Sequence, residues 1–236
     1  MPLQGINHFM MKYNRTTGAQ SWIGAPLQPA DTTDTWWRAL AVDSTNNFFG
    51  AGDVTNGGSL EIYVQRVTGG GTADWSSTIS NPGQIDLGNA IAVDLSTAAN
   101  DVVVAGFQTV AGQGKNAVIR KYTNAGTPIN SFAVNYDGPA SGDDEILDIA
   151  VDSSNGAIYA VGYESVAGQG TNMFIRRYNQ SGTTVVWART HHHAGAGNAG
   201  NDRAVSVALN GPYVIVVGDV TLAGGGKEIH VRKYAK

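Results

Sequence analysis

The sequence predicts an all-β protein, a β-propeller whose blades are four-stranded antiparallel sheets. Three observations support this fold class. A unit of about 56 residues recurs along the 236-residue chain, 31 glycines fall at turn-like intervals, and no segment has the apolar spacing of an amphipathic helix. Four-stranded units that repeat at periods of roughly 40 to 50 residues or slightly more are typical of propeller blades.

The repeat is most visible at the end of the third strand of each unit, where a basic residue precedes a tyrosine. The copies are Lys12-Tyr13, Lys121-Tyr122, Arg177-Tyr178 and Lys233-Tyr234, with Arg66-Val67 as the divergent one. The second residues of these pairs, at positions 13, 67, 122, 178 and 234, are separated by 54, 55, 56 and 56 residues. This regularity predicts one domain over 1–236, with repeats at about 6–37, 38–89, 90–147, 148–204 and 205–236.

Each unit contains four strand-like segments. The first is rich in small residues, which suits an innermost strand: 39–43, 90–94, 148–152 and 205–209. The second ends in a glycine: 48–52, 102–106, 158–162 and 214–218. The third is apolar on both alternating faces, as in 117–122 and 173–178, so it should be covered on both sides. The fourth carries an aromatic residue soon after a glycine turn: Trp22, Trp75, Phe132 and Trp187.

The strand count raises a question about closure. Residues 6–25 supply a third and a fourth strand, three full units follow, and 203–236 supply three more strands, which makes 17. Sixteen would make four blades, closed by pairing of the N-terminal fourth strand with the C-terminal third. The surplus strand Phe9 to Tyr13 is then a fifth, outermost strand, or the chain is a fragment, or copies join into a larger ring. A β-sandwich is the alternative fold.

The chain resembles the bacterial seven-bladed β-propeller repeat (SBBP-type) family. The residues that carry the resemblance are the stretches 86–94 and 144–152, which end in Ile-Ala-Val-Asp, the valine-glycine strand end, and the Phe-Ile-Arg-Arg-Tyr stretch 174–178 followed by Gly182. The resemblance implies an extracellular or cell-surface location in bacteria and says little about activity. Seven blades of this length would need roughly 390 residues, so this chain, with about four blades, departs from the family in number.

Composition excludes several classes. A net charge of -4 argues against a nucleic-acid partner, and the absence of cysteine excludes disulfides and thiolate metal sites. No apolar run approaches the roughly 18 residues of a membrane-spanning helix, so we expect no membrane insertion. The first residues show no signal peptide pattern. We expect no cofactor.

Glycine-rich loops between second and third strands, together with the blade-to-blade loops, predict one functional face. These loops are 56–58, 111–115, 167–171 and 223–227, and 24–34, 80–88, 136–143 and 191–201. Gln113, Asn116, Gln169 and Asn172 would place amide groups at equivalent sites there, which suits a neutral polyhydroxylated ligand. The Gly-Gln-Gly loops lack the spacing of a phosphate-binding loop, so we interpret them as tight turns.

Features that occur once are the other candidates for binding. Trp36 and Trp37 are adjacent, so one should enter the blade stack while the other could stack on a sugar. His191 and His193 share one side of an extended segment and could ligate a metal, but no nearby carboxylate completes a set, and the segment 143–145 lacks the spacing of a calcium loop. We therefore expect no metal site. Features present in every unit should be structural, and we expect Asp86, Asp144 and Asp202 to pair with the basic column Arg66, Lys121, Arg177 and Lys233.

Taken together, the sequence predicts a non-enzymatic binding or assembly module of a bacterial surface or secreted protein, with a glycan or a protein as ligand. One alternative is a propeller lyase or hydrolase that acts on a polymer through residues such as His191, His193 and Asp144. Another is a purely structural protein that forms homo-oligomers through Phe9 to Tyr13.

Overall fold

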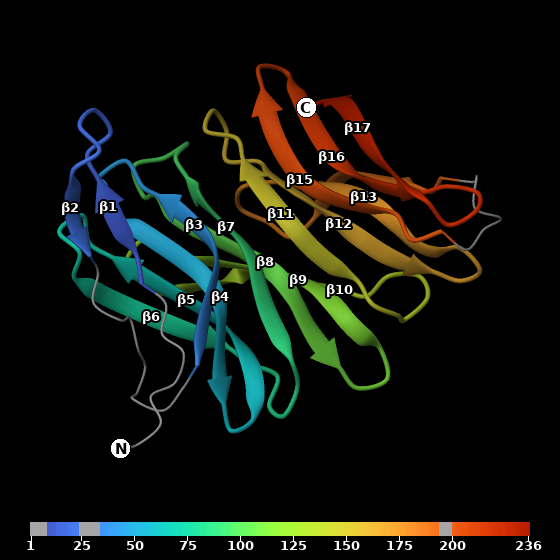
Figure 1. The fold of residues 1–236 in the computed structure, drawn as a ribbon, viewed down its shortest axis with the longest axis horizontal. Helices are drawn as coiled ribbons and strands as arrows, with labels where there is room; N and C mark the ends of the chain where they lie inside the picture. The colour runs from blue at the N-terminus through green and yellow to red at the C-terminus, as the bar shows by residue number, and fades with distance from the viewer. Residues whose placement is uncertain (1–8, 24–33, 194–199) are drawn as a thin grey trace.

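The computed structural model describes residues 9–23, 34–193 and 200–236, which form 17 β-strands and no helix (Figure 1). The all-β propeller fold and the strand number predicted from the sequence are confirmed. Consistent with this, none of the described residues belongs to a helix that could cross a membrane.

Twelve strands form three complete blades, each a four-stranded antiparallel sheet with strands in chain order. Blade I comprises β3 (Thr35–Val42), β4 (Phe48–Asn56), β5 (Ser59–Val67) and β6 (Ala73–Ile79). Blade II comprises β7 (Asp86–Asp94), β8 (Asp101–Val110), β9 (Gly114–Tyr122) and β10 (Pro128–Tyr136). Blade III comprises β11 (Glu145–Val151), β12 (Ile158–Val166), β13 (Gly170–Tyr178) and β14 (Val185–His191).

Both ends of the described chain carry incomplete blades. The N-terminal hairpin is β1 (Met11–Tyr13) paired with β2 (Gln20–Ile23), and the terminal sheet is β15 (Arg203–Asn210), β16 (Tyr213–Thr221) and β17 (Lys227–Ala235). The hairpin and the terminal sheet lie at opposite ends of the row of blades (Figure 1). Of the arrangements that the strand count left open, closure of a four-blade ring through β2 and β17 is not the one in the described residues, because β2 pairs with β1. Nor is β1 a fifth strand of a complete blade.

A glycine at the same place in each second strand lets the first strand approach closely. A Cβ at Gly52, Gly106, Gly162 or Gly218 would lie 1.7–2.1 Å from a carbonyl oxygen of the neighbouring first strand. The register shifts beside each of these glycines, so every first strand has a β-bulge there. The repeated valine-glycine signature is thus explained by backbone packing.

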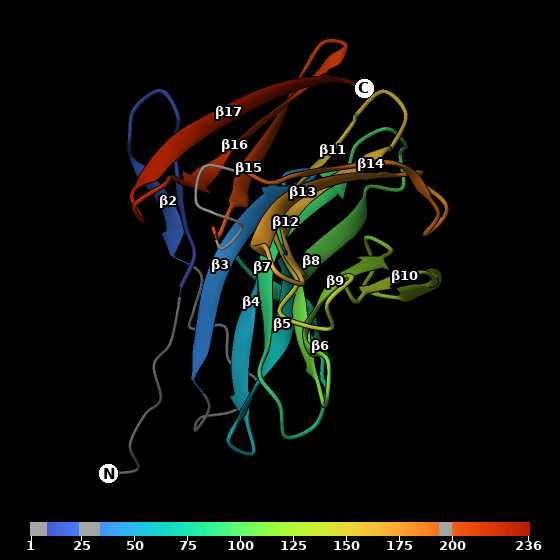
Figure 2. The same cartoon turned by 90° about the vertical axis from the view of Figure 1, so that its right-hand side faces the viewer.

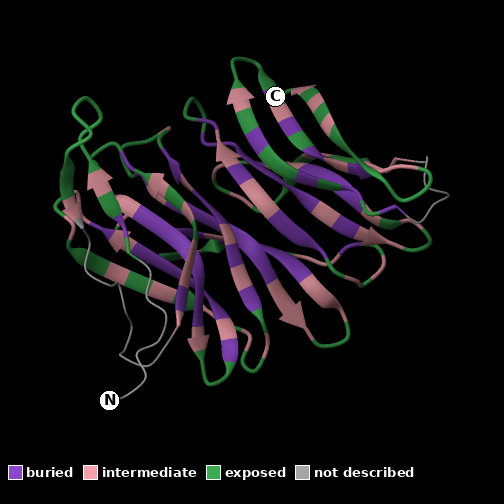
Figure 3. Cartoon of the chain, viewed as in Figure 1, coloured by how far each residue is buried: buried purple, intermediate pink, exposed green. Residues whose placement is uncertain are grey.

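Apolar side chains between neighbouring blades form the core. Phe49, Ala51, Ile62 and Val64 of blade I pack with residues of blade II such as Ile91. Equivalent clusters lie between blades II and III and between blade III and the terminal sheet. The views in Figures 2 and 3 show the terminal sheet at one end of this stack, with more exposed positions than the complete blades.

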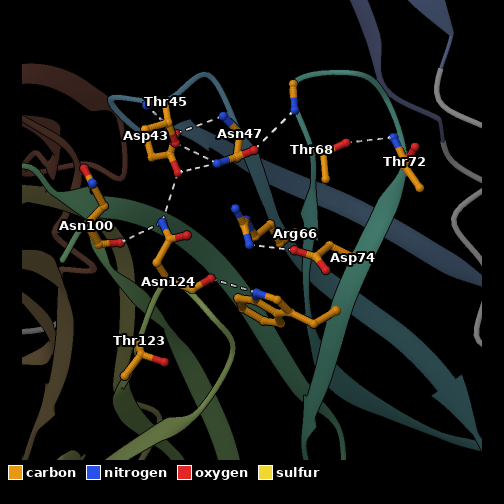
Figure 4. Close-up of polar contacts among 12 residues, drawn as sticks. Asp43, Thr45, Asn47, Arg66, Thr68, Thr72, Asp74, Asn100, Thr123 and Asn124 are labelled. Carbon is orange, nitrogen blue, oxygen red and sulfur yellow. Dashed lines mark hydrogen bonds and ion pairs between the residues drawn. The ribbon is translucent and has the colours of Figure 1, made fainter. Parts of the chain in front are cut away.

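Hydrogen bonds tie each blade to the next at the turns that follow the first strands. Asp43 Oδ2 accepts from Asn124 Nδ2 of blade II at 3.0 Å (Figure 4). In the next two pairs, Asp94 accepts from Gln180 at 2.9 Å and Asp152 from Lys236 at 2.7 Å. Burial acts to raise the pKa of Asp43, but hydrogen bonds from Asn47, Asn124 and Thr45 outweigh it and lower the pKa to about 2. The repeat therefore carries its own inter-blade link.

Candidate functional site

The strands extend into most of the segments that the sequence predicted as loops between second and third strands. In blades I to III these connections are turns of two or three residues, and Gly57, Gly58, Gly112 and Gly168 have positive φ there. This geometry is that of tight turns, as the sequence indicated for the Gly-Gln-Gly segments. Of the blade-to-blade loops, 24–33 and 194–199 lie outside the described residues.

The four amide residues predicted to bind a ligand pair with one another within their own hairpins. Asn116 Nδ2 donates to Gln113 Oε1 at 2.7 Å, and Asn172 Nδ2 donates to Gln169 Oε1 at the same distance. Each asparagine is buried, and its Oδ1 has no hydrogen-bond partner among the described residues. The glutamines are therefore turn residues, whereas each asparagine retains one free acceptor.

A cavity of about 250 Å³ lies beside Asn116, between the end of blade I and blade II. Its lining is mostly polar: Ser80, Asn81, Gln108, Val110, Asn116, Val118, Arg120 and Asn135. Asn81 and Ser80 follow β6, while the other six residues belong to β8, β9 and β10. Of the residues predicted as binding residues, only Asn116 lines this cavity.

Arg120 lies at the cavity wall with its guanidinium already engaged. It donates to Val134 O at 2.6 Å, to Gln108 Oε1 at 2.8 Å and to Asn135 Oδ1 at 2.7 Å. Burial lowers the pKa of Arg120. Because neutral acceptors already take its donors, this arginine does not make the cavity an anion site.

The repeated aspartates hold the backbone. Asp86 accepts from Asn81 N at 2.5 Å and from Thr109 N at 2.9 Å, and Asp202 accepts from His193 N at 2.6 Å and from Thr221 N at 2.8 Å. Asp144 is fully buried and likewise accepts from Gly138 N, and from Ser165 N at 2.8 Å. Burial raises the pKa of Asp144 to about 6, against the effect of these hydrogen bonds.

The predicted ion pairs between these aspartates and the basic column are wrong, because each basic residue has another partner. Arg66 pairs with Asp74 at 2.6 Å, and Lys121 with Asp94 and Asp101 at 3.4 and 3.3 Å. Arg177 Nε donates to the Tyr159 hydroxyl, and Lys233 Nζ lies 3.5 Å from the centroid of the Tyr213 ring. Backbone amides at the strand ends satisfy the aspartates instead.

The two adjacent tryptophans have different environments. Trp37 packs with Met10, Trp22 and Phe48 between the N-terminal hairpin and blade I, and its ring centroid lies 5.5 Å from that of Tyr63. Trp36 is half-buried, and its carbonyl oxygen is the atom closest to Gly52. Trp37 is therefore the member of the pair in the blade stack, and its role is packing.

The predicted histidines meet residues of the terminal sheet. The rings of His191 and His230 stack with centroids 4.8 Å apart, and Arg232 Nη2 lies 2.7 Å from His191 Nδ1. Burial and the neighbouring charges of Arg232 and His230 lower the pKa of His191 to about 4. Among the described residues, no three His, Asp or Glu side chains are placed to hold a metal ion. His193 contributes a backbone N–H to Asp202, as described above.

Two apolar patches lie at the ends of the stack. The C-terminal patch consists of Val217, Ile229 and Val231 on the terminal sheet, with Ile229 82% and Val231 61% exposed. The N-terminal patch consists of Leu40 and Val42 on β3, which are 57% and 43% exposed. A groove of about 310 Å³ beside Leu40 is also lined by Phe9, Met11 and Trp37.

Comparisons with known proteins give fold-level likenesses only. No protein-family model matches the chain, and no curated protein sequence does. The solved structures similar to it include a subtype N10 neuraminidase-like protein of A/little yellow-shouldered bat/Guatemala/060/2010 (10% identity, TM-score 0.47, 96% of this chain and 63% of that one). Another is a subtype N11 neuraminidase-like protein of A/flat-faced bat/Peru/033/2010 (10% identity, TM-score 0.48, 97% and 59%). The chain thus spans about three fifths of the length of these proteins.

Sequence reasoning missed most residues of the cavity and both apolar patches. The signal for the cavity was present at one aligned position, because Ile79 stands where the next two blades have Tyr136 and His191. The signal for the C-terminal patch was the alternation of Ile229 and Val231 with Glu228, His230 and Arg232 in the last strand. Neither could be interpreted without knowing which blade face has a neighbour.

Proposed function

We propose that this chain is a non-enzymatic binding and assembly module whose incomplete end blades join a second copy. The observation that carries the proposal is the exposure of Ile229 and Val231. Ile229 and Val231 lie five and three residues before Tyr234. The residues at the same two positions of the complete blades are only 0–3% exposed: Ile62 and Val64, Ala117 and Ile119, and Met173 and Ile175. Among the described residues, no further sheet covers this face of the terminal sheet.

The two apolar patches are the two halves of one repeated contact. Ile62 and Val64 of blade I pack in one cluster with Ile91 and Val93 of blade II. The C-terminal patch is equivalent to the first half of that cluster, and Leu40 and Val42 are equivalent to the second. Both patches are exposed in the same chain, so they do not cover each other. A head-to-tail contact between copies would place the terminal sheet of one against β3 of the next.

The surroundings of Asp144 and His191 and the repeat sequence support a non-enzymatic binding role. The polar atoms of Asp144 and His191 that an enzyme would use are bonded to backbone amides and to Arg232, which favours a non-enzymatic role. The SBBP-type repeat stretches favour a bacterial surface or secreted protein, with a glycan or a protein as ligand on the loop face.

Native mass spectrometry of the chain at several concentrations tests the assembly. We expect dimers or larger forms that increase with concentration. Burial of an isoleucine or a valine contributes about 1.5–3 kcal/mol, so Ile229→Asp with Val231→Asp should weaken association by at least about tenfold. Glu228→Lys is the matched control on the opposite face of β17. A monomer at every concentration, or oligomers that the double variant leaves unchanged, would refute the proposal.

A further inference from the structure

The interfaces between consecutive blades share one recurring arrangement. At two of them the last residue of a fourth strand contacts an arginine on the third strand of the next blade: Tyr136 contacts Arg176, and His191 contacts Arg232. At the first interface, Ile79 and Arg120 occupy the equivalent positions. These residues are equivalent because Ile79, Tyr136 and His191 pair with Ile62, Ala117 and Met173, which occupy one repeat position.

In two of the three interfaces the position holds a ring. The guanidinium carbon of Arg176 lies 3.7 Å from the ring centroid of Tyr136, whose hydroxyl donates to Glu164. The same tyrosine ring makes an edge contact with Phe174. At the last interface the imidazole of His191 contacts Arg232. A ring against the arginine is therefore what the repeat accommodates at this position.

At the interface between blades I and II the ring is missing. Each group that Tyr136 contacts has an equivalent in the lining of the 250 Å³ cavity: Gln108 for Glu164, Val118 for Phe174 and Arg120 for Arg176. Ile79 is smaller than tyrosine, and Val118 is smaller than phenylalanine. The cavity therefore lies at the position that the side-chain ring of Tyr136, with its hydroxyl group, occupies one blade further along.

The polar groups around the cavity define the chemistry of an occupant. The donors of Arg120 are taken by neutral oxygens, so no anion is required. Asn116 Oδ1 is an acceptor without a partner in a residue only 7% exposed. Both amide groups of Gln108 are engaged, with Arg120 and Asp86, whereas Asn81 uses its Nδ2 for Thr109 O and Asn135 its Oδ1 for Arg120. The cavity therefore offers a hydroxyl-bearing ligand the Asn116 oxygen and the second amide group of Asn81 and of Asn135.

We propose that this cavity binds one neutral pyranose ring of a glycan. Its volume lies below the roughly 300–1,000 Å³ of sites for drug-sized ligands, which suits a single sugar unit. Asn116 Oδ1 would accept a hydrogen bond from a sugar hydroxyl, and the Asn135 amide nitrogen would donate one. This site lies between blades I and II of one chain and does not depend on the assembly of copies.

Saturation-transfer difference NMR with the full chain tests the proposal. The probes are the methyl pyranosides of glucose, galactose, mannose and N-acetylglucosamine, with sialic acid as an anionic arm and p-cresol as a phenolic arm. We expect at least one neutral glycoside to bind and the two other arms to show no binding. If no neutral glycoside binds, or if only sialic acid or p-cresol does, the proposal is overturned.

Variants locate the site. Ile79→Tyr introduces the residue found at the equivalent place of the next blade, so it should fill the cavity and abolish binding while the melting temperature stays equal or rises. Asn116→Ala should weaken binding about tenfold, because a buried hydrogen bond is lost. Asn172→Ala is the matched control, since Asn172 has the same unpartnered oxygen beside a site that Tyr136 already fills. Binding that survives Ile79→Tyr and Asn116→Ala would also overturn the proposal.

Discussion

The repeated aspartates show how one residue type can organise this fold. Asp86, Asp144 and Asp202 each lie at the start of a first strand. Each accepts one N–H group from the loop just before it and one from the end of the following second strand. A carboxylate suits this place because it accepts at two oxygens and offers no competing donor when ionised. These residues therefore fix the point where one blade ends and the next begins.

Replacement of Asp144 by alanine should destabilise the fold. Two buried backbone N–H groups would lose their acceptor, and each unsatisfied group costs about 1–3 kcal/mol, so the free energy of unfolding should fall by roughly 2–6 kcal/mol. Urea unfolding followed by circular dichroism measures this. Glu228→Ala, which removes an exposed carboxylate, should change little. An unchanged midpoint in Asp144→Ala would show that the carboxylate does not hold the backbone.

The aspartates could be recognised from the sequence because the eight-residue spacing between Asp86 and Asp94 recurs between Asp144 and Asp152. The basic residues predicted as their partners were wrong. Charges are visible in a sequence, whereas backbone N–H groups at a strand end are not. Lys121 and Arg177 were the partners predicted from the sequence because they lie in the same repeat and carry the complementary charge. In the structure, Lys121 forms an ion pair with Asp94, and Arg177 donates a hydrogen bond to the Tyr159 hydroxyl.

At the scale of strands and blades, the fold was predictable because each element repeats its pattern. Small first strands, the glycine at Gly106 and its equivalents, and apolar third strands all follow from one unit seen several times. Differences between copies were harder to interpret. Ile79, Tyr136 and His191 occupy one position, yet only the packing of neighbouring blades shows that the isoleucine leaves a cavity. The single histidine run was considered as a metal site and set aside because no carboxylate completes a set, but its contact with the terminal sheet, where His191 stacks on His230, could not be read from the sequence.

The contact between blade III and the terminal sheet should weaken in acid. His191 faces His230, Arg232, Asp202 and His193, and its pKa is lowered to about 4 from 6.5. A histidine with a depressed pKa binds fewer protons in the folded state than in the unfolded state between these values. The contribution of His191 to the free energy of unfolding is therefore complete above about pH 6.5 and is lost as the pH falls toward 4.

Thermal melts of the wild type and of His191→Gln at several pH values isolate this contribution. The raised pKa of Asp144 acts in the opposite direction, since its protonation favours the folded state as the pH falls through about 6, so only the difference between the two proteins is informative. The stability difference should move against the wild type as the pH decreases from 6.5 to 4. His193→Gln should track the wild type. Parallel curves for the wild type and His191→Gln would exclude this role.

At the scale of the whole molecule, the two ends of the stack duplicate one strand. Lys12-Tyr13 on β1 and Lys233-Tyr234 on β17 are copies of the same repeat position, so both strands are third strands. The sequence revealed this surplus but not its consequence, because closure depends on how the incomplete blades are placed. The structure shows β1 paired with β2 at three positions and β17 paired with β16 at nine.

This duplication leads to a prediction about the N-terminal strand. In a head-to-tail assembly, β17 of one copy and β1 of the next would compete for the third place of the shared blade. Because β17 is paired over more residues than β1, we expect β17 to displace β1 from this place. Deletion of residues 1–14 removes the competing strand and should therefore strengthen association. Sedimentation equilibrium of the truncated chain beside the intact one measures the change. If the strand Phe9 to Tyr13 were itself the connector, which is one of the alternatives that the sequence left open, the same deletion would give monomers.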